Sequence, residues 1–420
     1  MTRLSSLLLV PLLLAAPASS QTVAAQGWIA PVAEGAQPAR SPASPVPAAA
    51  ARYTVRPILL TGQPAPGGGT FTEFSDPALN GRGDLAFAAL STSSSGQAAV
   101  YLWNGTGTTV LVQRGRPAPS GGEFTAFNDV ILNDRQAVVF LGQTTDRAAH
   151  QGLYLARAGT IAPIVVTGQP APSDGVFTDF ANPTINAQDV VAFVGRMSGG
   201  GREGIFSATE GGITPLVLSG QPAPTGGRFQ FFLDGSPSQN DRGEVAFIAS
   251  TVPRGTFGVY VLVGARPEPV VTTEDDAPAG GRFTEFGFLT LTNAGTVGFV
   301  GRAARSVVPE GLYVTGRAVL VMLARQGEAA SGEILTTFVN SAMNQQESIV
   351  FELGTPDPIP RAIFVATRAG IRVVVRAGDL APSRRRFRAF GTPAINDRGQ
   401  VAFVAETDDG RHGIYLVSPL

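Results

Sequence analysis

The sequence contains no cysteine and no lysine, and only two histidines. These absences exclude thiolate nucleophiles, disulfide bonds, Schiff-base lysines and zinc sites built from cysteine and histidine. All 31 basic residues are arginines, and 32 acidic residues bring the formal net charge to −1. We therefore expect no nucleic-acid partner, because binding to a polyanion draws on a basic surface.

The first 52 residues differ in composition from the rest of the chain. Residues 1–20, MTRLSSLLLVPLLLAAPASS, combine one arginine, an apolar run and small residues before Gln21, which predicts a bacterial secretory signal peptide. The apolar run is shorter than the roughly 20 residues of a membrane span, so we expect no transmembrane segment after cleavage. Residues 21–52 are rich in alanine and proline and predict a disordered linker.

A unit of 52 to 54 residues recurs seven times between Tyr53 and the last residue. Each copy has a phenylalanine in an Ala-Phe or similar pair, and a second phenylalanine stands 13 residues earlier in most copies. The first set is Phe87, Phe140, Phe193, Phe247, Phe299, Phe351 and Phe403, and the second is Phe74, Phe127, Phe180, Phe232, Phe286, Phe338 and Phe390. We interpret both sets as structural residues that fill the contacts between units.

Each unit has the size of one propeller blade. In the first full unit, apolar, β-branched and aromatic residues predict strands at 70–79, 85–91, 98–103 and 108–113. The second of these, LAFAAL, is apolar on both faces and must be covered on both sides, as it is between stacked blades. The sequence therefore predicts an all-β fold for residues 53–420, a seven-bladed β-propeller of four-stranded blades.

The two ends of the repeat region complement each other. The last unit lacks a fourth strand, whereas VRPILLTGQPAP, starting at Val55, aligns with the fourth strand of the other units. We predict that the N-terminal strand, at about residues 53–61, completes the seventh blade and closes the ring. Closure would leave no open sheet edge.

Two short motifs mark the connections within and between units. An asparagine stands seven residues before the paired phenylalanine in six copies, at Asn80, Asn133, Asn186, Asn240, Asn344 and Asn396. Asparagine followed by glycine predicts a hairpin turn, whereas an EF-hand calcium loop would need more carboxylates and a closing glutamate. The GQPAP motif predicts the crossing between blades, since proline fixes φ and cannot donate a hydrogen bond.

The segments NGRGDLAF, NDRGEVAF and NDRGQVAF resemble the signature of bacterial tandem NxxGxxAF-repeat (choice-of-anchor) proteins. The resemblance covers nearly all of residues 53–420. It implies a secreted or surface-displayed propeller without an assigned activity. Members often end in an anchoring segment, whereas this sequence ends in YLVSPL. We therefore expect a periplasmic or extracellular protein without a C-terminal anchor, and we expect a monomer.

The loops between second and third strands differ most between copies, so we expect a binding surface there. They should lie on one face of the ring and recognise an unknown protein or glycan through arginines, which offer bidentate donors to anions. The candidates are Arg147, His150, Arg202, Arg254, Arg305, Arg361, Arg411 and His412. The alternative is that these are ordinary solvated loops, because acidic residues are interspersed.

A second hypothesis is a carbohydrate-active enzyme with carboxylates in the central channel. Glu73, Asp179 and Glu285 hold matching positions on the first strands of three units. If they converged, they could divide the acid and base roles or bind a structural cation. The alternative is that they point to solvent. We therefore assign no catalytic residue, no metal ligand and no cofactor from the sequence.

Overall fold

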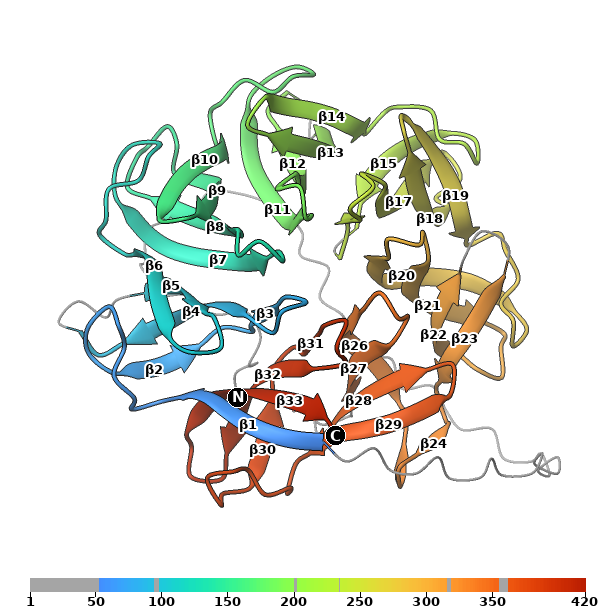
Figure 1. Cartoon of the computed structure of the whole chain (residues 1–420). Helices are drawn as coiled ribbons and strands as arrows, with labels where there is room; N and C mark the ends of the chain where they lie inside the picture. The colour runs from blue at the N-terminus through green and yellow to red at the C-terminus, as the bar shows by residue number, and fades with distance from the viewer. Residues whose placement is uncertain (1–52, 94–97, 200–201, 234, 316–318, 355–361) are drawn as a thin grey trace, which may run out of the picture. The chain divides into compact units, whose positions relative to one another are not determined.

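The computed structural model describes residues 53–93, 98–199, 202–233, 235–315, 319–354 and 362–420. These residues form seven antiparallel sheets arranged in a ring (Figure 1). No helix occurs among them. The prediction of an all-β, seven-bladed propeller is confirmed. The expected signal peptide, 1–20, and linker, 21–52, lie outside the described residues.

The first four blades follow the chain in order, each beginning with its innermost strand. Blade 1 contains β2 (Phe71–Phe74), β3 (Ala78–Leu79), β4 (Leu85–Ser91), β5 (Ala98–Trp103) and β6 (Thr108–Gln113). Blade 2 contains β7 (Phe124–Leu132), β8 (Val138–Thr144), β9 (Gln151–Arg157) and β10 (Thr160–Val166). Blade 3 contains β11 (Phe177–Ile185), β12 (Val191–Met197), β13 (Arg202–Thr209) and β14 (Gly212–Leu218). Blade 4 contains β15 (Arg228–Phe232), β16 (Ser238–Gln239), β17 (Val245–Val252), β18 (Phe257–Val263) and β19 (Arg266–Thr272).

The remaining blades continue around the ring. Blade 5 contains β20 (Arg282–Leu291), β21 (Val297–Ala304), β22 (Glu310–Thr315) and β23 (Leu320–Arg325). A small hairpin of β24 (Ala329–Ala330) and β25 (Glu333–Ile334) follows. Blade 6 contains β26 (Thr337–Met343), β27 (Ile349–Gly354), β28 (Ala362–Thr367) and β29 (Gly370–Arg376). Blade 7 contains β30 (Phe387–Phe390), β31 (Ala394–Ile395), β32 (Val401–Thr407), β33 (His412–Pro419) and β1 (Tyr53–Leu60).

Blade 7 is built from both ends of the described chain. Its outermost strand, β1, pairs antiparallel with β33, from Tyr53 opposite Pro419 to Leu60 opposite Gly413 (Figure 1). The predicted closure of the ring is confirmed. The Arg56 guanidinium also lies 5.1 Å from the ring centre of Trp103 in blade 1, so β1 contacts the neighbouring blade as well.

Aromatic side chains of one blade pack on aliphatic side chains of the blade before it. In blade 1, Phe87 and Tyr101 stack with ring centres 5.5 Å apart. Their cluster contacts Ala402, Val404 and Ile414 of blade 7. Both sets of phenylalanines named from the sequence are buried in all seven blades. The aromatic rings thus fill the space between two blades, packed against alanine and larger aliphatic side chains.

A third aromatic position recurs in six blades and was missed in the sequence. It lies three residues before the inner phenylalanine, at Phe71, Phe124, Phe177, Phe229, Phe283 and Phe387. In blade 1, the Phe71 ring meets Tyr101 edge-on at 5.2 Å. Blade 6 has the fully buried Leu335 at this position. Six blades therefore share a cluster of four aromatic rings.

The GQPAP segments join the outermost strand of one blade to the innermost strand of the next. In the first copy, the Gly62 N–H donates to the Phe71 carbonyl at 2.8 Å, and Ala65 is buried. Gly62 has a φ of 88°, a conformation that glycine adopts without steric cost. This segment is a structural connection, as the sequence predicts.

The hairpin asparagines of six blades each donate a hydrogen bond to the next blade around the ring. In blade 1, Asn80 Oδ1 accepts from the N–H groups of Arg82 and Asp84, at 3.0 and 2.8 Å, which forms the expected turn. Asn80 Nδ2 donates to the Asn133 carbonyl in blade 2 at 3.1 Å. The last such bond runs from Asn396 to the Asn80 carbonyl at 2.9 Å and joins the seventh blade to the first.

Blade 5 has a threonine in place of this asparagine. Thr292 Oγ1 accepts from the Thr296 N–H at 3.0 Å, so the turn is preserved. Its carbonyl accepts from Asn240 Nδ2 at 3.0 Å. The threonine hydroxyl replaces the amide oxygen of asparagine as the acceptor in the turn. Threonine has no amide NH₂ group, so it cannot donate a side-chain bond to the next blade as asparagine does.

Candidate functional site

The predicted loop surface carries arginines that are largely balanced by nearby acids. Arg202, Arg254 and Arg411 form ion pairs with Asp174, Glu274 and Asp409, at 3.5, 3.6 and 3.7 Å. Within the described residues, Arg147 and Arg305 are exposed and have no ion pair. His150 Nδ1 lies 3.2 Å from Thr167 Oγ1, and the His412 N–H donates to Thr61 Oγ1 at 3.3 Å. Arg361 lies outside the described residues.

The three acids named from the sequence lie on innermost strands, where Glu73 and Glu285 are exposed and Asp179 is half-buried. Asp179 pairs with Arg196 at 2.8 Å, and Glu285 pairs with Arg302 at 2.9 Å. Glu73 lies opposite Leu90 in the sheet. Two of these carboxylates are thus paired with arginines.

A buried carboxyl group on the second strand of blade 6 was missed in the sequence. Glu352 is fully buried, and its Oε2 accepts from Asn340 Nδ2 at 3.0 Å. Its Oε1 has no hydrogen-bond partner. Burial raises the pKa of Glu352 to about 8, the bond from Asn340 opposes the shift, and the charge of Asp76 adds to it.

Asp76 belongs to the same region. It lies two residues after the inner phenylalanine of blade 1, the position that Asn340 holds in blade 6 and Thr392 in blade 7. Burial raises the pKa of Asp76 to about 6, and hydrogen bonds from the Thr392 side chain and backbone partly oppose this shift. The charge of Asp76 in blade 1 thus acts on the carboxyl group of Glu352 in blade 6.

A groove between blades 2 and 3 offers room for a ligand. It has a volume of about 930 Å³, within the usual range for ligand sites. Aliphatic side chains line it, among them Leu155, Ile164, Val191 and Ile213. Pro163, in the outermost strand of blade 2, and the GQPAP segment after that strand form another part of the wall.

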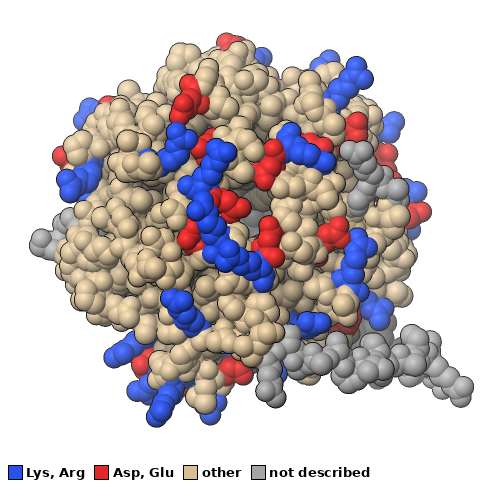
Figure 2. All heavy atoms as spheres, viewed as in Figure 1, with Lys and Arg blue, Asp and Glu red and all other residues tan. Residues whose placement is uncertain are grey.

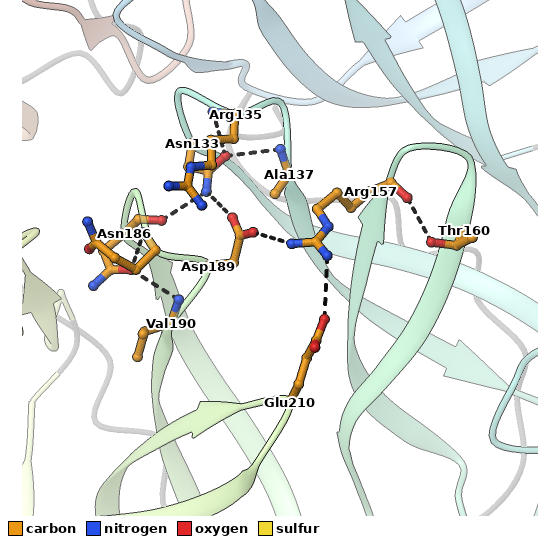
Figure 3. Close-up of polar contacts among 10 residues, drawn as sticks. Asn133, Arg135, Ala137, Arg157, Thr160, Asn186, Asp189, Val190 and Glu210 are labelled. Atoms are coloured by element: carbon orange, nitrogen blue, oxygen red, sulfur yellow. Dashed lines mark hydrogen bonds and ion pairs between the residues drawn. The ribbon is translucent and has the colours of Figure 1, made fainter.

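Charged side chains lie at one part of this groove (Figure 3). Arg157, at the end of β9, points toward Asp189 in the β11–β12 hairpin, with 2.5 Å between Nη1 and Oδ2. Its Nη2 lies 3.5 Å from Glu210 in the β13–β14 turn, and the Glu210 side chain is 86% exposed. Arg157 of blade 2 therefore contacts two separate turns of blade 3.

Asp189 connects Arg157 to the ring of asparagine hydrogen bonds. Its side chain is only 9% exposed. Its Oδ1 accepts from Asn133 Nδ2 at 2.7 Å, while Asn133 also donates to the Asn186 carbonyl at 2.9 Å (Figure 3). The amide of a hairpin asparagine thus positions the acid that holds Arg157. Pairing with Glu210 is weaker because the distance is longer and the carboxylate is in solvent.

None of the residues predicted to bind a ligand lines this groove. The signal that could have located it is a departure from the repeat. Asp189 replaces the glycine of the NxxG motif, in NAQD, and Arg157 stands where blade 1 has Asn104. Similarly, Glu352 stands where blades 1 and 7 have Ala88 and Val404, which are buried and apolar. Glu352 puts an ionisable group where the other blades are apolar, whereas blade 6 carries its own charged pair, with Glu347 at the position of Asp189 and Arg368 in the turn that corresponds to that of Arg157.

Charges of both signs gather around a hollow at the centre of the face shown in Figure 2. In the described residues, no group of three or more histidine, cysteine, aspartate or glutamate side chains is arranged to hold a metal ion. Among the same residues, no helix is long and apolar enough to cross a membrane.

A family model described as "Family of unknown function (DUF7453)" matches residues 48–357 and 354–416. The chain belongs to this family. A search of curated proteins found no match for this DUF7453 chain. The family assignment gives no activity, so function must be argued from the structure.

Among solved structures, the DUF7453 chain resembles a puromycin-hydrolysing peptidase from Mycobacterium tuberculosis, with 16% identity and a TM-score of 0.52. The match covers 83% of this chain and 52% of the peptidase, so it spans about half of that protein. A second resemblance is to PorZ of Porphyromonas gingivalis, a surface component of the type-IX secretion system, with 12% identity and a TM-score of 0.46 over 84% and 47% of the two chains. At these identities, the likeness to the peptidase shows the fold alone.

Proposed function

We propose that this propeller is a binding module, and that the groove between blades 2 and 3 holds a peptide with aliphatic side chains and a carboxylate. The observation that carries the proposal is the combination of an aliphatic wall with arginines at one part of the same groove. Leu155, Ile164 and Ile213 are half-buried, so a ligand would remove apolar surface from water.

The charges determine where the carboxylate would bind. Asp189 holds one end of the Arg157 guanidinium, whereas the other end faces only the solvent-exposed Glu210. Arg135 also lines the groove and is exposed, with no ion pair in the described part of the chain. A ligand carboxylate can displace Glu210 and accept from both arginines, because guanidinium groups favour paired hydrogen bonds with carboxylates.

The lining favours a peptide over a glycan. No aromatic side chain is among the described residues that line the groove. Aliphatic and proline side chains present no flat aromatic face on which a sugar ring could stack. They match leucine, isoleucine or valine side chains of an extended peptide instead.

The test uses fluorescein-labelled hexapeptides that end in Leu, Ile or Val, each with a free C-terminal carboxylate or an amide. We expect saturable binding measured by anisotropy for the free acids and weaker binding for the amides. R157A should reduce binding of the acid and remove the difference between acid and amide. R368A is the matched control, because Arg368 pairs with a hairpin acid of blade 6, Glu347, at 2.7 Å.

Two outcomes would contradict the proposal: no peptide of the panel binds, or R157A and R368A bind the acids equally well. If R157A unfolds, Ile213→Glu provides a second variant that leaves the ion pairs of Arg157 in place. This variant puts a charge on the apolar wall and should weaken binding of both peptide forms.

The loops between second and third strands are a second candidate surface, for an anionic glycan or protein. Arg147 and Arg305 favour it, because both are exposed and have no ion pair within the described residues. Dextran sulfate and neutral dextran are the probes for surface plasmon resonance. We expect binding of the sulfated polymer only, with a loss in the double variant R147A/R305A. Equal binding by the double variant and the unmodified protein would exclude this surface.

We also propose that the protein acts outside the cytoplasm. The support is the sequence of residues 1–20, which has the composition of a secretory signal. Fractionation of a bacterial host should yield a shortened chain outside the cytoplasm. A full-length chain confined to the cytoplasm would contradict this.

A further inference from the structure

Phe231, on the innermost strand of blade 4, is the one exposed aromatic side chain within the described residues. Its exposed fraction is 54%, so more than half of its surface is open to a ligand. No other blade has an aromatic ring at this position, which holds Glu73, Ala126, Asp179, Glu285, Thr337 and Ala389. The ring is thus a departure from the repeat that the packing of the blades does not require.

The backbone around Phe231 is held on both sides. The Phe231 N–H donates to Ser250 Oγ in the next strand of blade 4 at 3.2 Å. The N–H of the buried Phe232 donates to Glu203 Oε1 of blade 3 at 2.6 Å. The sheet register also shifts just before Phe232, a bulge that turns Phe231 out of the core. The ring therefore projects from a fixed part of the fold, and a ligand would not have to order the strand on binding.

A polar network of blade 3 begins at Glu203, beside the strand that carries this ring (Figure 1). The Arg196 Nε lies 3.8 Å from Glu203 Oε2, and its Nη1 lies 2.8 Å from Asp179 Oδ2. Asp179 Oδ1 accepts from Gln151 Nε2 of blade 2 at 3.2 Å. The side chains of Arg196 and Asp179 are 55% and 38% exposed, whereas Glu203 is buried. One buried carboxylate thus connects the strand of blade 4 to a guanidinium and a second carboxylate that solvent reaches.

We propose that this surface at the boundary of blades 3 and 4 binds a neutral hexose unit of a glycan, with Phe231 as the ring on which the sugar stacks. The C–H groups on one face of a pyranose carry partial positive charge, which favours the negative face of an aromatic ring. The Asp179 carboxylate can accept from sugar hydroxyls, and Arg196 Nη2, which neither ion pair engages, can donate to one. Two carboxylates and one guanidinium make the network negative, which disfavours a sulfated or acidic sugar.

Blade 5 repeats the polar network without the aromatic ring. Arg302 pairs with Glu285 at 2.9 Å and with Glu310 at 2.7 Å. Glu310 Oε1 accepts a backbone N–H of blade 6 at 2.7 Å, as Glu203 does from blade 4. Blade 6, however, has Thr337 at the position of the exposed ring. The two boundaries share the charges and differ in the ring, so blade 5 supplies a control for the charged residues.

The test is isothermal titration calorimetry of the full-length protein with cellohexaose, maltohexaose, chitohexaose and mannohexaose. We expect saturable binding of at least one of them. F231A should weaken this binding by about tenfold, because the sugar loses its stacking surface. L380A is the matched control, since Leu380 is a 64% exposed apolar side chain in the crossing between blades 6 and 7. D179N should also weaken binding, whereas E285Q, at the matching position of blade 5, should not.

The proposal is overturned if none of the four hexaoses binds, or if F231A and L380A bind them equally well. It is also overturned if D179N and E285Q have the same effect, because the network of blade 3 would then not contact the sugar. The site is independent of the groove between blades 2 and 3, so F231A should bind the labelled peptides unchanged. If F231A keeps the sugar and loses the peptides, the ring belongs to a peptide site instead.

Discussion

Replacing Asn344 tests whether the asparagine ring holds the blades together. Asn344 is 5% exposed, and its Nδ2 donates to the Asn396 carbonyl of blade 7 at 2.9 Å. Its Oδ1 accepts from the N–H groups of Gln346 and Ser348 at 3.1 and 3.0 Å. Asn344→Ala removes all three bonds. At about 0.5–1.5 kcal/mol for each net hydrogen bond, we expect a loss of about 2–4 kcal/mol in the free energy of unfolding.

Threonine at the same position separates the turn from the link between blades. Blade 5 shows that a threonine hydroxyl can accept the N–H of the residue four positions on, as Thr292 does from Thr296 at 3.0 Å. Asn344→Thr should therefore keep much of the turn and lose the bond to Asn396. We expect it to cost about 1 kcal/mol, clearly less than the alanine variant.

The assay is urea unfolding followed by circular dichroism, with the slope of the transition compared between variants. An unchanged slope shows that the difference in midpoint reports stability. If the threonine and alanine variants are equally destabilised, the two hydrogen bonds within the turn contribute nothing measurable, and the bond to blade 7 accounts for the whole loss. If both lie within about 0.5 kcal/mol of the unmodified protein, the ring of bonds does not stabilise the fold.

Three further predictions concern the ring of blades and the buried carboxyl group of Glu352. Thr292→Asn should raise the midpoint of urea unfolding, because the new amide can donate to the hairpin of blade 6, as Asn240 donates to the Thr292 carbonyl at 3.0 Å. An unchanged midpoint would mean that this seventh bond between blades does not form. Deleting residues 53–60 should lower the melting temperature strongly, since β33 loses its partner strand, and an unchanged melting temperature would refute closure by β1. Stability should fall as the pH rises from about 4.5 to about 8, because folded Glu352 keeps a proton that the unfolded chain releases. The free energy of unfolding should change by up to about 1.4 kcal/mol per pH unit, and by less in E352Q. If E352Q and the unmodified protein show the same pH dependence, the pKa of Glu352 is not raised by folding.

The sequence by itself predicts the ring because each unit repeats the same spacing of strands, buried phenylalanines and turns. The strands expected at 85–91, 98–103 and 108–113 coincide with β4, β5 and β6. The first strand, expected at 70–79, is divided into β2 and β3 instead. That division lies next to Asp76, where the inner strand becomes irregular. Local alternation of apolar residues does not reveal such a break, because it depends on how the inner strand meets its neighbours.

The candidate site was not predictable from composition or loop variability. The loops that differ most contain arginines paired with adjacent acids, as in Arg202 with Asp174. The groove depends instead on Arg157 and Asp189, which are 32 residues apart and meet only when blades 2 and 3 pack side by side. A departure from NxxG marked Asp189 in the sequence, but it did not show which cation the carboxylate would meet.

The sequence determined the number of blades, the strand that closes the ring and the turns that asparagine and glycine form, because these follow from periodicity and local hydrogen bonding. Only the tertiary structure decided how Asn133, Asp189 and Arg157 join two blades at a groove, and how burial and the charge of Asp76 raise the pKa of Glu352. These groups belong to different repeats. Their contacts arise from the rotation of one blade relative to the next, which one-dimensional spacing does not encode.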